Sequence, residues 1–368
     1  MIPDIQSQDP GTIDIVDRLA ILGARYDAAP NFPCESMSAL IESGHHRWFA
    51  PQICGGLPFE DEAARCRAMA QALREVGRGD LSIARLYEGH VNALSLFEWY
   101  GVPDQFRWLA NALDRGAWFG VWATEPSPGV RLTRETVPSL LGEKIFASGA
   151  GGLDYALVTA ASEGEHRRLV IVRADEKVRA DLSGWRVRGM RASVSGRYVL
   201  DDVTVEPDML LGKPGDYDQD PRFTAGAWRF CAAQLGGIEA LVTEIRRSMR
   251  DAAREDPVQR ARFADATVAV RTAGFWVAEA AQRFASGHDD AVAVARMTRG
   301  VVEDAGFIVM EAAARILGTQ SALDGQRADK IVRDLSLYLR QAGPDHARDE
   351  AAKALLDHDI WVEGERLW

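Results

Sequence analysis

The chain has 368 residues, of which 47% are hydrophobic and 26% charged, so it can bury a large core or several connected ones. An excess of 54 acidic over 43 basic side chains gives a net charge of −11, which opposes binding to nucleic acid and to anionic membrane surfaces. We therefore expect a protein of about two or three domains that binds a small molecule or a soluble partner, and neither nucleic acid nor a membrane.

The four cysteines, Cys34, Cys54, Cys66 and Cys231, are scattered without a CxxC pair, so they indicate neither a metal site nor a disulfide framework. Buried free thiols are the simpler interpretation. The segment MIPDIQSQDP has no basic start followed by an apolar run, and no stretch reaches the roughly 18 apolar residues of a membrane span. A cytoplasmic protein is therefore expected.

Apolar residues recur three and four apart from about residue 12 to residue 115, as in TIDIVDRLAILGARY and DEAARCRAMAQALREVG, and this spacing predicts helices. VPDQFRWLANALDRG is typical of a further helix, which Pro103 and Asp104 begin and Gly116 ends. Residues 1–115 are therefore predicted to form an N-terminal helical domain.

The pattern changes after residue 115, where short segments are rich in β-branched and aromatic residues and are separated by turn formers. They predict the strands of a small β domain over residues 116–215. The predicted strand segments are WFGVWATEP, GEKIFASGA, YALVTAAS, RLVIVRA, WRVRGM and GRYVLDDVTV.

Helical spacing resumes after GKPGDYDQDP in long, alanine-rich segments, with Gly287 and Gly318 as predicted helix ends. Residues 216–368 are therefore predicted to form a C-terminal helical bundle. The expected fold class is mostly α with a central β domain, and the absence of a sequence repeat argues against a solenoid.

This order of elements, together with several short motifs, resembles the acyl-CoA dehydrogenase superfamily of FAD enzymes over nearly the whole chain. ATEPSPG (123–129) stands where the family has a Thr-Glu-Pro-Gly turn, and GEKIFASGA (142–150) where it has Gly-x-Lys-x-aromatic-x-Thr/Ser. The resemblance implies an N-terminal helical domain, a small β-barrel or sandwich and a C-terminal four-helix bundle. Further matching segments are ALIESGHHRWFAPQICGG, GMRASVSGRYVLDDVTVEPDMLLG, RILGTQ and IVRDLSLYLRQAGPD.

The resemblance also implies that the β domain binds the isoalloxazine ring of FAD. By position in the motifs, Thr124 and Ser148 would supply hydroxyls to the ring, and Phe146 would cover one of its faces. Trp122, two residues before Thr124 on a presumed strand, would shield it as well. Fixed donors and a wall against water suit a ring that becomes anionic when it takes up hydride. The alternative is that the hydroxyls cap turns and that Phe146 is ordinary core.

In this family the rest of FAD lies partly against a neighbouring subunit, which implies a homodimer or homotetramer. Arg315 and Gly318 of RILGTQ would then be cofactor contacts, with Arg315 as a fork for the pyrophosphate. The other interpretation of Arg315 is a surface arginine near a helix end. Residues 247–265 lack the Phe-Gly of the family's Arg-x-x-Phe-Gly, and PSPGVRLT lacks its Gly-Ser-Asp, so both departures bear on cofactor affinity.

The glutamate that removes an α-proton in the family's dehydrogenases is missing here. In most members it follows the Arg-Asp pair by about eight residues, and counting from Arg333 and Asp334 leads to Ala342. In a minority it precedes an arginine on the first helix of the bundle, and that arginine resembles Arg229, which follows Trp228. Neither position holds a carboxylate.

Asp345 is the candidate for a relocated base, and its alternative role is the N-cap of the last helix. His346 beside it is the residue to examine for a different chemistry, because flavin monooxygenases of this fold often carry histidines in this region. Arg229 would contact an acyl or thioester group, or alternatively form an ion pair between helices.

Three functions follow from these features. The main prediction is an FAD-dependent oxidoreductase that oxidises an acyl thioester or a related substrate, by α-proton abstraction and hydride transfer to flavin N5 with a non-standard base. The second is a flavin-dependent monooxygenase of the same fold, which needs no such base. The third is a non-catalytic scaffold that has lost the chemistry.

Overall fold

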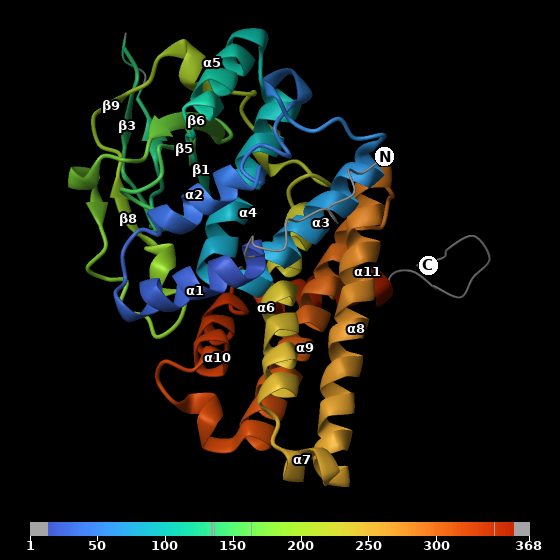
Figure 1. Ribbon diagram of the computed structural model, residues 1–368. Helices are drawn as coiled ribbons and strands as arrows, with labels where there is room; N and C mark the ends of the chain where they lie inside the picture. The colour runs from blue at the N-terminus through green and yellow to red at the C-terminus, as the bar shows by residue number, and fades with distance from the viewer. Residues whose placement is uncertain (1–13, 134, 136, 163, 342, 357–368) are drawn as a thin grey trace.

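The computed structural model describes residues 14–133, 135, 137–162, 164–341 and 343–356, so the segment MIPDIQSQDP lies outside the described residues. Helices, strands and further helices follow one another along the chain, as predicted, and the colours of Figure 1 change from blue through green to orange in this order. The first helices are α1 (Ile15–Ala28), α2 (Cys34–Glu42), α3 (Glu62–Gly79), α4 (Leu81–Tyr100) and α5 (Pro103–Asp114).

Helix α4 is the central helix of the N-terminal region, because most of its residues are buried. Asp80 caps it by accepting a hydrogen bond of 3.0 Å from the backbone N–H of Ile83. Three polar residues, Arg85, Glu88 and Asn92, stand three, four and seven positions apart and therefore share one face of α4. This face contributes to the site described below.

Within the described residues, the chain between Phe119 and Leu211 forms three small sheets. The largest has the order β1-β5-β6-β10, in which β1 and β5 are parallel and the other neighbours antiparallel. The other two, β2-β3-β9 and β4-β8-β7, are antiparallel throughout. The strands are β1 (Phe119–Trp122), β2 (Arg131–Leu132), β3 (Ser139–Leu141), β4 (Glu143–Ala147), β5 (Tyr155–Ala160), β6 (Arg168–Arg173), β7 (Ala180–Asp181), β8 (Gly196–Val199), β9 (Val203–Thr204) and β10 (Leu210–Leu211).

The prediction of a strand at WRVRGM is wrong, because this segment packs on helix α10 (Arg327–Tyr338) instead of pairing with a neighbouring strand. A Cβ added to Gly189 would come within 2.0 Å of the carbonyl oxygen of Arg333, so only glycine allows this approach. Met190 has a left-handed φ of 55°, and its N–H donates to Asp334. The β propensity of the segment is overridden by this docking.

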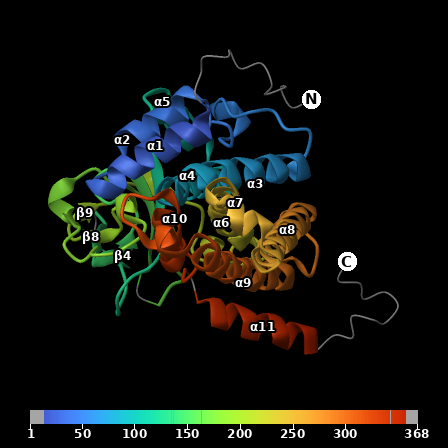
Figure 2. The same cartoon turned by 60° about the horizontal axis from the view of Figure 1, so that its bottom comes forward.

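The C-terminal helices α6 (Trp228–Ser248), α8 (Pro257–Ser286) and α9 (Ala291–Leu317) lie side by side as long helices in the lower part of Figure 1, and α7 (Asp251–Glu255) connects α6 to α8. As predicted, Gly287 and Gly318 end α8 and α9, with φ of 62° and 60°. Helix α3 packs against α6 and α8, so the N-terminal helices and the bundle share one core. Helix α11 (Pro344–Leu356) covers α9, as Figure 2 shows.

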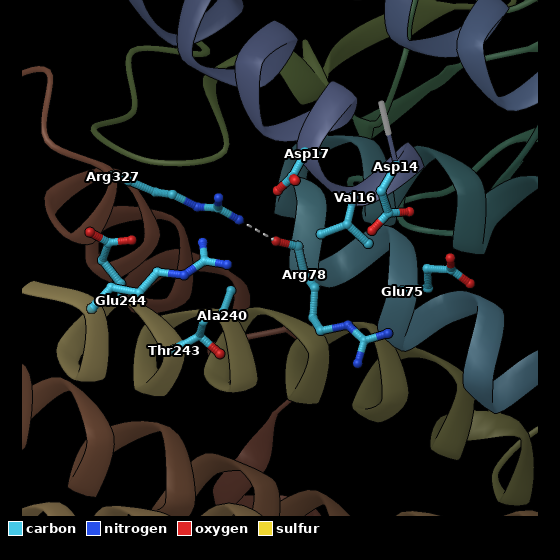
Figure 3. Close-up of a pocket in the computed structure, with 10 residues that line it drawn as sticks. Asp14, Val16, Asp17, Glu75, Arg78, Ala240, Thr243, Glu244 and Arg327 are labelled. Atoms are coloured by element: carbon cyan, nitrogen blue, oxygen red, sulfur yellow. Dashed lines mark hydrogen bonds between the residues drawn. The ribbon is translucent and has the colours of Figure 1, made fainter. Parts of the chain in front are cut away.

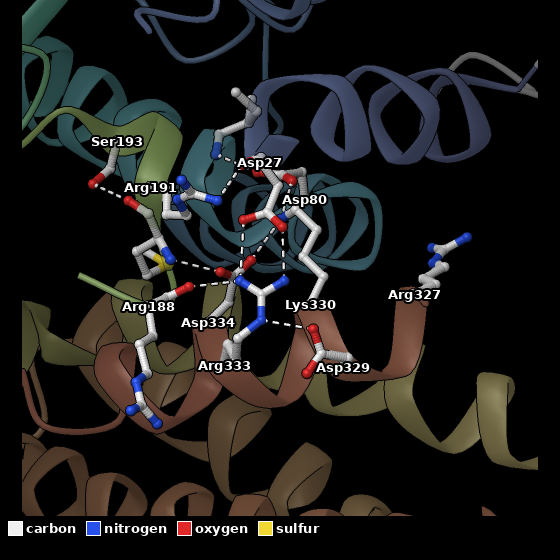
Figure 4. A network of polar contacts seen from close by, with 12 residues as sticks. Asp27, Asp80, Arg188, Arg191, Ser193, Arg327, Asp329, Lys330, Arg333 and Asp334 are labelled. Carbon is white, nitrogen blue, oxygen red and sulfur yellow. Dashed lines mark hydrogen bonds and ion pairs between the residues drawn. The ribbon is translucent and has the colours of Figure 1, made fainter. Parts of the chain in front are cut away.

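A buried ionic network joins α10 to the N-terminal helices and to the strand region (Figure 4). The ammonium of Lys330 lies 2.6 Å from the carboxylate of Asp80 and 2.6 Å from that of Asp334. Arg333 pairs with Asp27 of α1 at 2.7 Å. The Arg-Asp pair of the sequence therefore fixes α10 in place.

Cys54, Cys66 and Cys231 are buried free thiols as predicted, whereas Cys34 is exposed because it begins α2 at the surface. None of the described helices is long and apolar enough to cross a membrane. Among the described residues there is also no group of His, Cys, Asp and Glu side chains that could hold a metal ion.

Candidate functional site

A cavity of about 500 Å³ lies where the strand region meets α10, and we call it the serine cavity. Its wall comes from the end of β4, from the loop that follows β7 and from the last turn of α10. The lining residues are Arg85, Thr124, Phe146, Ser148, Trp185, Met190, Ser193, Ser195, Leu337, Tyr338, Arg340 and Gln341.

Three hydroxyls form a hydrogen-bonded row on the wall of the serine cavity. Ser195 Oγ donates to Ser148 Oγ at 2.9 Å and lies 2.9 Å from Ser193 Oγ, which donates to the carbonyl of Met190 at 2.8 Å. Because Ser148 accepts the hydrogen of Ser195, its own hydrogen can be donated to a ligand in the cavity. The row thus offers an oriented donor at the position where the sequence predicts one.

The two motifs that carry the strongest sequence signal are held together in the structure. The carbonyl of Thr124 accepts a hydrogen bond of 3.0 Å from the N–H of Ile145, and the buried Lys144 pairs with the carboxylate of Glu125. Burial lowers the pKa of the Lys144 ammonium to about 8, although the hydrogen bond to Glu125 acts in the opposite direction. These contacts bring Thr124 and Ser148 to the wall of one cavity.

Phe146 stands in a strained backbone conformation at the edge of the serine cavity. Its φ is 53°, which is uncommon for an aromatic residue. The pairing of β4 with β8 shifts register between Lys144 and Ala147, and this irregularity turns the ring away from the core. The side chain is 63% exposed and lines the cavity, so the alternative of a core phenylalanine is wrong. Its role as a cover for a flat ligand stays a prediction.

Trp122 lies behind the wall and lines none of the cavities described here. Its indole is buried against Tyr198, with 5.0 Å between ring centroids, and its Nε1–H donates to the carbonyl of Ser148 at 3.0 Å. Trp122 therefore supports Ser148 from the core, which differs from the predicted position beside a bound ring.

A second cavity of about 500 Å³ adjoins the first, and we call it the arginine cavity. Arg85, Thr124 and Gln341 line both cavities, so the two cavities meet at these residues. The remaining wall comes from α4, from the loop before α6 and from the first turns of α6, α9 and α11. Its charged residues are Arg85, Glu88, Arg222, Arg229, Arg296 and Arg299, and its aromatic residues are Trp99, Tyr100, Tyr217, Phe223, Phe230 and His346.

Arg229 is a buried cation in the wall of the arginine cavity. Its side chain is 7% exposed, its Nε–H donates to Asn92 Oδ1 at 2.6 Å, and its guanidinium lies over the rings of Trp99, Trp228 and Phe284 at 5.4 to 5.7 Å. It has no carboxylate partner among the described residues, so the predicted alternative of an ion pair between helices is absent there. Burial lowers the pKa of the guanidinium.

The carboxylates of the two cavities do not match the predicted base. Asp345 is exposed in the first turn of α11 and lines neither cavity, and the helix begins at Pro344, so Asp345 is not its N-cap. Its neighbour His346 lines the arginine cavity. Glu88 is the one carboxylate among the lining residues, and it accepts hydrogen bonds from Arg85 and Asn92. Ala342, predicted to replace the glutamate, lies outside the described residues.

Arg315 and Gly318 lie at the C-terminal end of α9 and line none of these cavities. Arg315 is exposed and pairs with Glu311 one turn earlier at 2.7 Å, which agrees with the surface alternative. Within one chain the structure does not bring these two residues to the other predicted cofactor contacts. Their assignment to a cofactor bound across a subunit boundary stays a prediction.

Two further cavities have different chemistry. A small one of about 260 Å³ between α1, α3, α6 and α10 is lined by acidic and basic side chains together (Figure 3), which is typical of a solvated cleft. In it Arg327 donates to the carbonyl of Arg78 at 2.9 Å. A larger one of about 610 Å³ shares Trp185 with the serine cavity, and its lining, as far as the chain is described, contains Lys177, Arg186 and Arg191 but no acidic residue.

Ser193, Ser195, Glu88 and the arginines of α9 line the two cavities but were not among the residues predicted from the sequence. The segment Gly-Met-Arg-Ala-Ser-Val-Ser was recognised as a family motif, so its serines could have been named. The face of α4 that carries Arg85, Glu88 and Asn92 was also readable, because three polar residues interrupt an otherwise buried helix. Arg296 and Arg299 had no such signal.

The comparisons with known proteins agree with this architecture. The family model described as acyl-CoA dehydrogenase, C-terminal domain, matches residues 218–354. A dibenzothiophene monooxygenase of Mycolicibacterium goodii is 25% identical over 288 residues, 69% of this chain and 68% of that protein. The probable FMNH2-dependent monooxygenase SfnC of Pseudomonas putida is 27% identical over 212 residues, 55% of this chain, and the match spans 51% of its own length.

Two solved structures show the same fold. The complex of TdsC from Paenibacillus sp. A11-2 with FMN and indole has a TM-score of 0.81 at 19% identity, covering 94% of this chain and 96% of that one. A glutaryl-coenzyme A dehydrogenase with glutaryl-CoA has a TM-score of 0.80 at 18% identity, covering 95% and 97%. Since both a monooxygenase-type complex and a dehydrogenase share the fold, the fold does not choose between the two chemistries.

Proposed function

The chain belongs to the acyl-CoA dehydrogenase superfamily, and from this premise we propose that it is a flavin-dependent monooxygenase, which uses reduced FMN and dioxygen to oxygenate a small organic substrate. One observation carries this proposal: two cavities of similar size meet at Arg85, Thr124 and Gln341, and Glu88, the one carboxylate among their described lining residues, is bound by Arg85 and Asn92. The first cavity then holds the flavin ring and the second the substrate.

The serine cavity suits the polar edge of an isoalloxazine ring. Ser148 donates from a row of hydroxyls whose geometry is already set by Ser195 and Ser193, so little reorganisation is needed when a ligand binds. Phe146 supplies an exposed aromatic face at the cavity wall. A bound reduced flavin supplies two electrons and reacts with dioxygen, whereas the protein orients the ring and keeps water from it.

The burial and the hydrogen bonds of Glu88 favour oxygenation over α-proton abstraction. A base for a dehydrogenase must be free to take a proton from the substrate carbon. Glu88 is 3% exposed and is occupied by Arg85 and Asn92, so its oxygens are already bound by an ionic donor and an amide donor. Asp345 is exposed outside both cavities. A monooxygenase needs neither residue as a base.

FMN fits this chain better than the FAD expected from the family resemblance. The connection between α6 and α8 is the short helix α7 with no aromatic residue, so no ring is available there for an adenine. Arg315, the predicted fork for a pyrophosphate, is paired with Glu311 instead. The single phosphate of FMN needs only a local basic site, and the cavity beyond Trp185 contains Lys177, Arg186 and Arg191. Among the similar proteins, SfnC is described as a probable FMNH2-dependent monooxygenase, and TdsC has been crystallised with FMN.

Isotope transfer tests the proposal. The protein is mixed with FMN, a flavin reductase, NADH and ¹⁸O₂, and with dibenzothiophene, indole and aromatic carboxylates and sulfinates as substrates. We expect one ¹⁸O atom in the product of at least one substrate, absent when the protein is omitted. Oxidation of the reduced flavin without labelled product from any of these substrates would contradict the proposal.

A dehydrogenase remains the second candidate because Glu88 does line the arginine cavity next to Thr124. If Glu88 acts as a base, acyl thioesters should bleach the oxidised flavin bound to the protein in the absence of oxygen. Glu88→Gln should then abolish the bleaching while the flavin stays bound. Our proposal predicts no bleaching by acyl thioesters in either protein. A chain that binds neither FMN nor FAD would support the scaffold alternative instead.

A further inference from the structure

We propose that the arginine cavity selects a substrate with an oxyanionic group, a carboxylate, sulfinate or sulfonate, attached to a flat apolar body, and that Arg229 binds this group. The inference deepens the proposed function, because it rests on the assignment of the flavin to the serine cavity and of the substrate to its neighbour. It concerns the chemical class of the substrate, which the family membership leaves open.

The charge of the cavity wall is opposite to the charge of the chain. The whole protein has a net charge of −11, yet the described residues of the lining include five arginines, Glu88 as their one acidic residue, and no lysine. The charge of Glu88 is balanced by Arg85. The wall therefore keeps an excess of positive charge, and an anion entering the cavity is attracted there although the protein as a whole repels it.

Arg229 is the residue of the cavity wall at which an anion is expected to bind. Its guanidinium is buried without a carboxylate among the described residues, and a buried charge without a partner is costly. Its Nε–H is bound by Asn92, whereas no described residue accepts a hydrogen bond from its two Nη groups. A Cβ added to Gly226 would come within 2.3 Å of Nη2, so the absence of a side chain at position 226 leaves room for the guanidinium. The free edge of this fork matches the two oxygens of a carboxylate or sulfinate.

The other cations of the cavity support Arg229 from different directions. Arg299 of α9 is 5% exposed and lies over the ring of Phe230 at 5.2 Å. Arg296, one turn earlier, is 3.7 Å from Glu350 and is therefore partly neutralised. Arg222 is exposed over the ring of Trp99 at 5.1 Å, where it can attract an anion from solvent. Arg222 is thus exposed, whereas Arg299 and Arg229 are buried.

The rest of the wall suits an aromatic or other flat apolar body. Trp99, Tyr100, Tyr217, Phe223 and Phe230 all line the cavity, and aromatic side chains pack well against flat ligands. A purely inorganic anion would leave these rings in contact with water, so the expected ligand combines both properties.

The spacing along α4 separates the boundary of the two cavities from the level of Arg229. Arg85 lines both cavities, and Asn92, which accepts the hydrogen bond from Arg229, is seven residues further along the helix. Seven residues of α-helix rise by about 10 Å. We therefore choose probes with a fused two-ring body.

Binding of matched naphthalene probes tests this inference without any enzymatic turnover. Calorimetry compares 2-naphthoate and 2-naphthalenesulfonate with the neutral 2-naphthamide, on the wild-type protein and on Arg229→Gln. We expect the two anions to bind at least tenfold more tightly than the amide, and Arg229→Gln to remove this difference. Arg107→Gln, which changes an exposed arginine on α5 outside both cavities, serves as the matched control and keeps the preference.

Three results would overturn the inference: no binding of either anion at millimolar concentration, equal affinity for anions and amide in the wild-type protein, or an unchanged preference in a folded Arg229→Gln. The wild-type comparison decides the question even if the variant does not fold. A further titration of the protein with 2-naphthoate in saturating FMN shows whether the arginines bind the substrate anion or the phosphate of the cofactor. Displacement of 2-naphthoate by FMN would mean that the arginines hold the phosphate of the cofactor. Anion selectivity without flavin binding would contradict only the proposed function.

Discussion

The carboxylate of Asp334 accepts a hydrogen bond of 2.5 Å from the backbone N–H of Met190, a residue 144 positions earlier in the chain. Asp334 is 1% exposed and also binds Lys330. Met190 in turn accepts a hydrogen bond from Ser193 through its carbonyl. The wall of the serine cavity is therefore fixed by α10, and the geometry of the hydroxyl row depends on a residue of the helical bundle.

Loss of Asp334 is expected to destabilise the protein. Asp334→Ala removes one partner of a buried ion pair and leaves the N–H of Met190 unbonded, which together cost about 3 kcal/mol of unfolding free energy. Urea denaturation measures this. Asp349→Ala, which breaks an exposed pair with Lys353, is the control and is expected to leave the denaturation midpoint nearly unchanged. Equal effects of the two changes would contradict the role assigned to Asp334.

Ser148 is expected to contribute to flavin affinity. Ser148→Ala removes one hydrogen-bond donor from the cavity wall, and a neutral hydrogen bond contributes about 1 kcal/mol, so the Kd for FMN should rise about fivefold. Quenching of FMN fluorescence on titration with protein measures it. Ser95→Ala, which removes a buried hydroxyl bonded to the carbonyl of Val91 within α4, should leave the Kd unchanged.

Two stacked histidines are expected to make the protein sensitive to acid. His90 donates from Nε2 to the carbonyl of His46 at 2.8 Å and accepts from the N–H of Phe119 at Nδ1, so it is held as the neutral imidazole. Burial lowers the pKa of His90 well below its ordinary value and also lowers that of His46. Below pH 6.5 the unfolded state therefore binds protons that the folded state does not bind.

Stability should consequently fall as the pH decreases from about 6.5 toward 5, by about 1.4 kcal/mol per pH unit for each histidine that stays neutral in the folded state. Denaturation curves at several pH values measure the slope. His90→Gln should reduce this slope by the share of one histidine. A slope that His90→Gln leaves unaltered would be evidence against this assignment.

An exposed apolar surface on α8 and α9 supports the expected homo-oligomer. Val268 and Phe275 of α8 are 64% and 67% exposed, and Phe307 and Ile308 of α9 are 52% and 43% exposed. Helices α8 and α9 pack against each other, and exposed apolar side chains on neighbouring helices are a feature of many protein interfaces. We expect light scattering to give a dimer or tetramer and Phe307→Glu to reduce its size. Val178→Glu, at a 93% exposed site near β7, should not, and a wild-type monomer would contradict the expectation.

The fold could be predicted from local patterns because each pattern has a direct physical cause. The helix ends at Gly287 and Gly318 follow from their positive φ, and the change of period after residue 115 marks the first strand. WRVRGM was misassigned because its β propensity is outweighed by contacts with Arg333 and Asp334, which are far away in sequence. Local patterns carry no information about such contacts.

The site was predictable only where motif positions identify it. Thr124 and Ser148 line the same cavity because the turn that carries Glu125 is paired with Lys144. Trp122 was expected beside a ligand, but the chain leaves the strand at this residue and its indole enters the core. The arginine cavity combines α4, α6, α9 and α11, and no sequence pattern indicates that four separate helices meet.

The most direct test of the account is a crystal structure of the protein with FMN. We expect the isoalloxazine ring in the serine cavity, with its polar edge about 3 Å from the hydroxyl of Ser148 and one face directed toward the arginine cavity. A ring bound elsewhere, or a serine cavity filled by the side chain of Phe146 in the presence of saturating FMN, would contradict it.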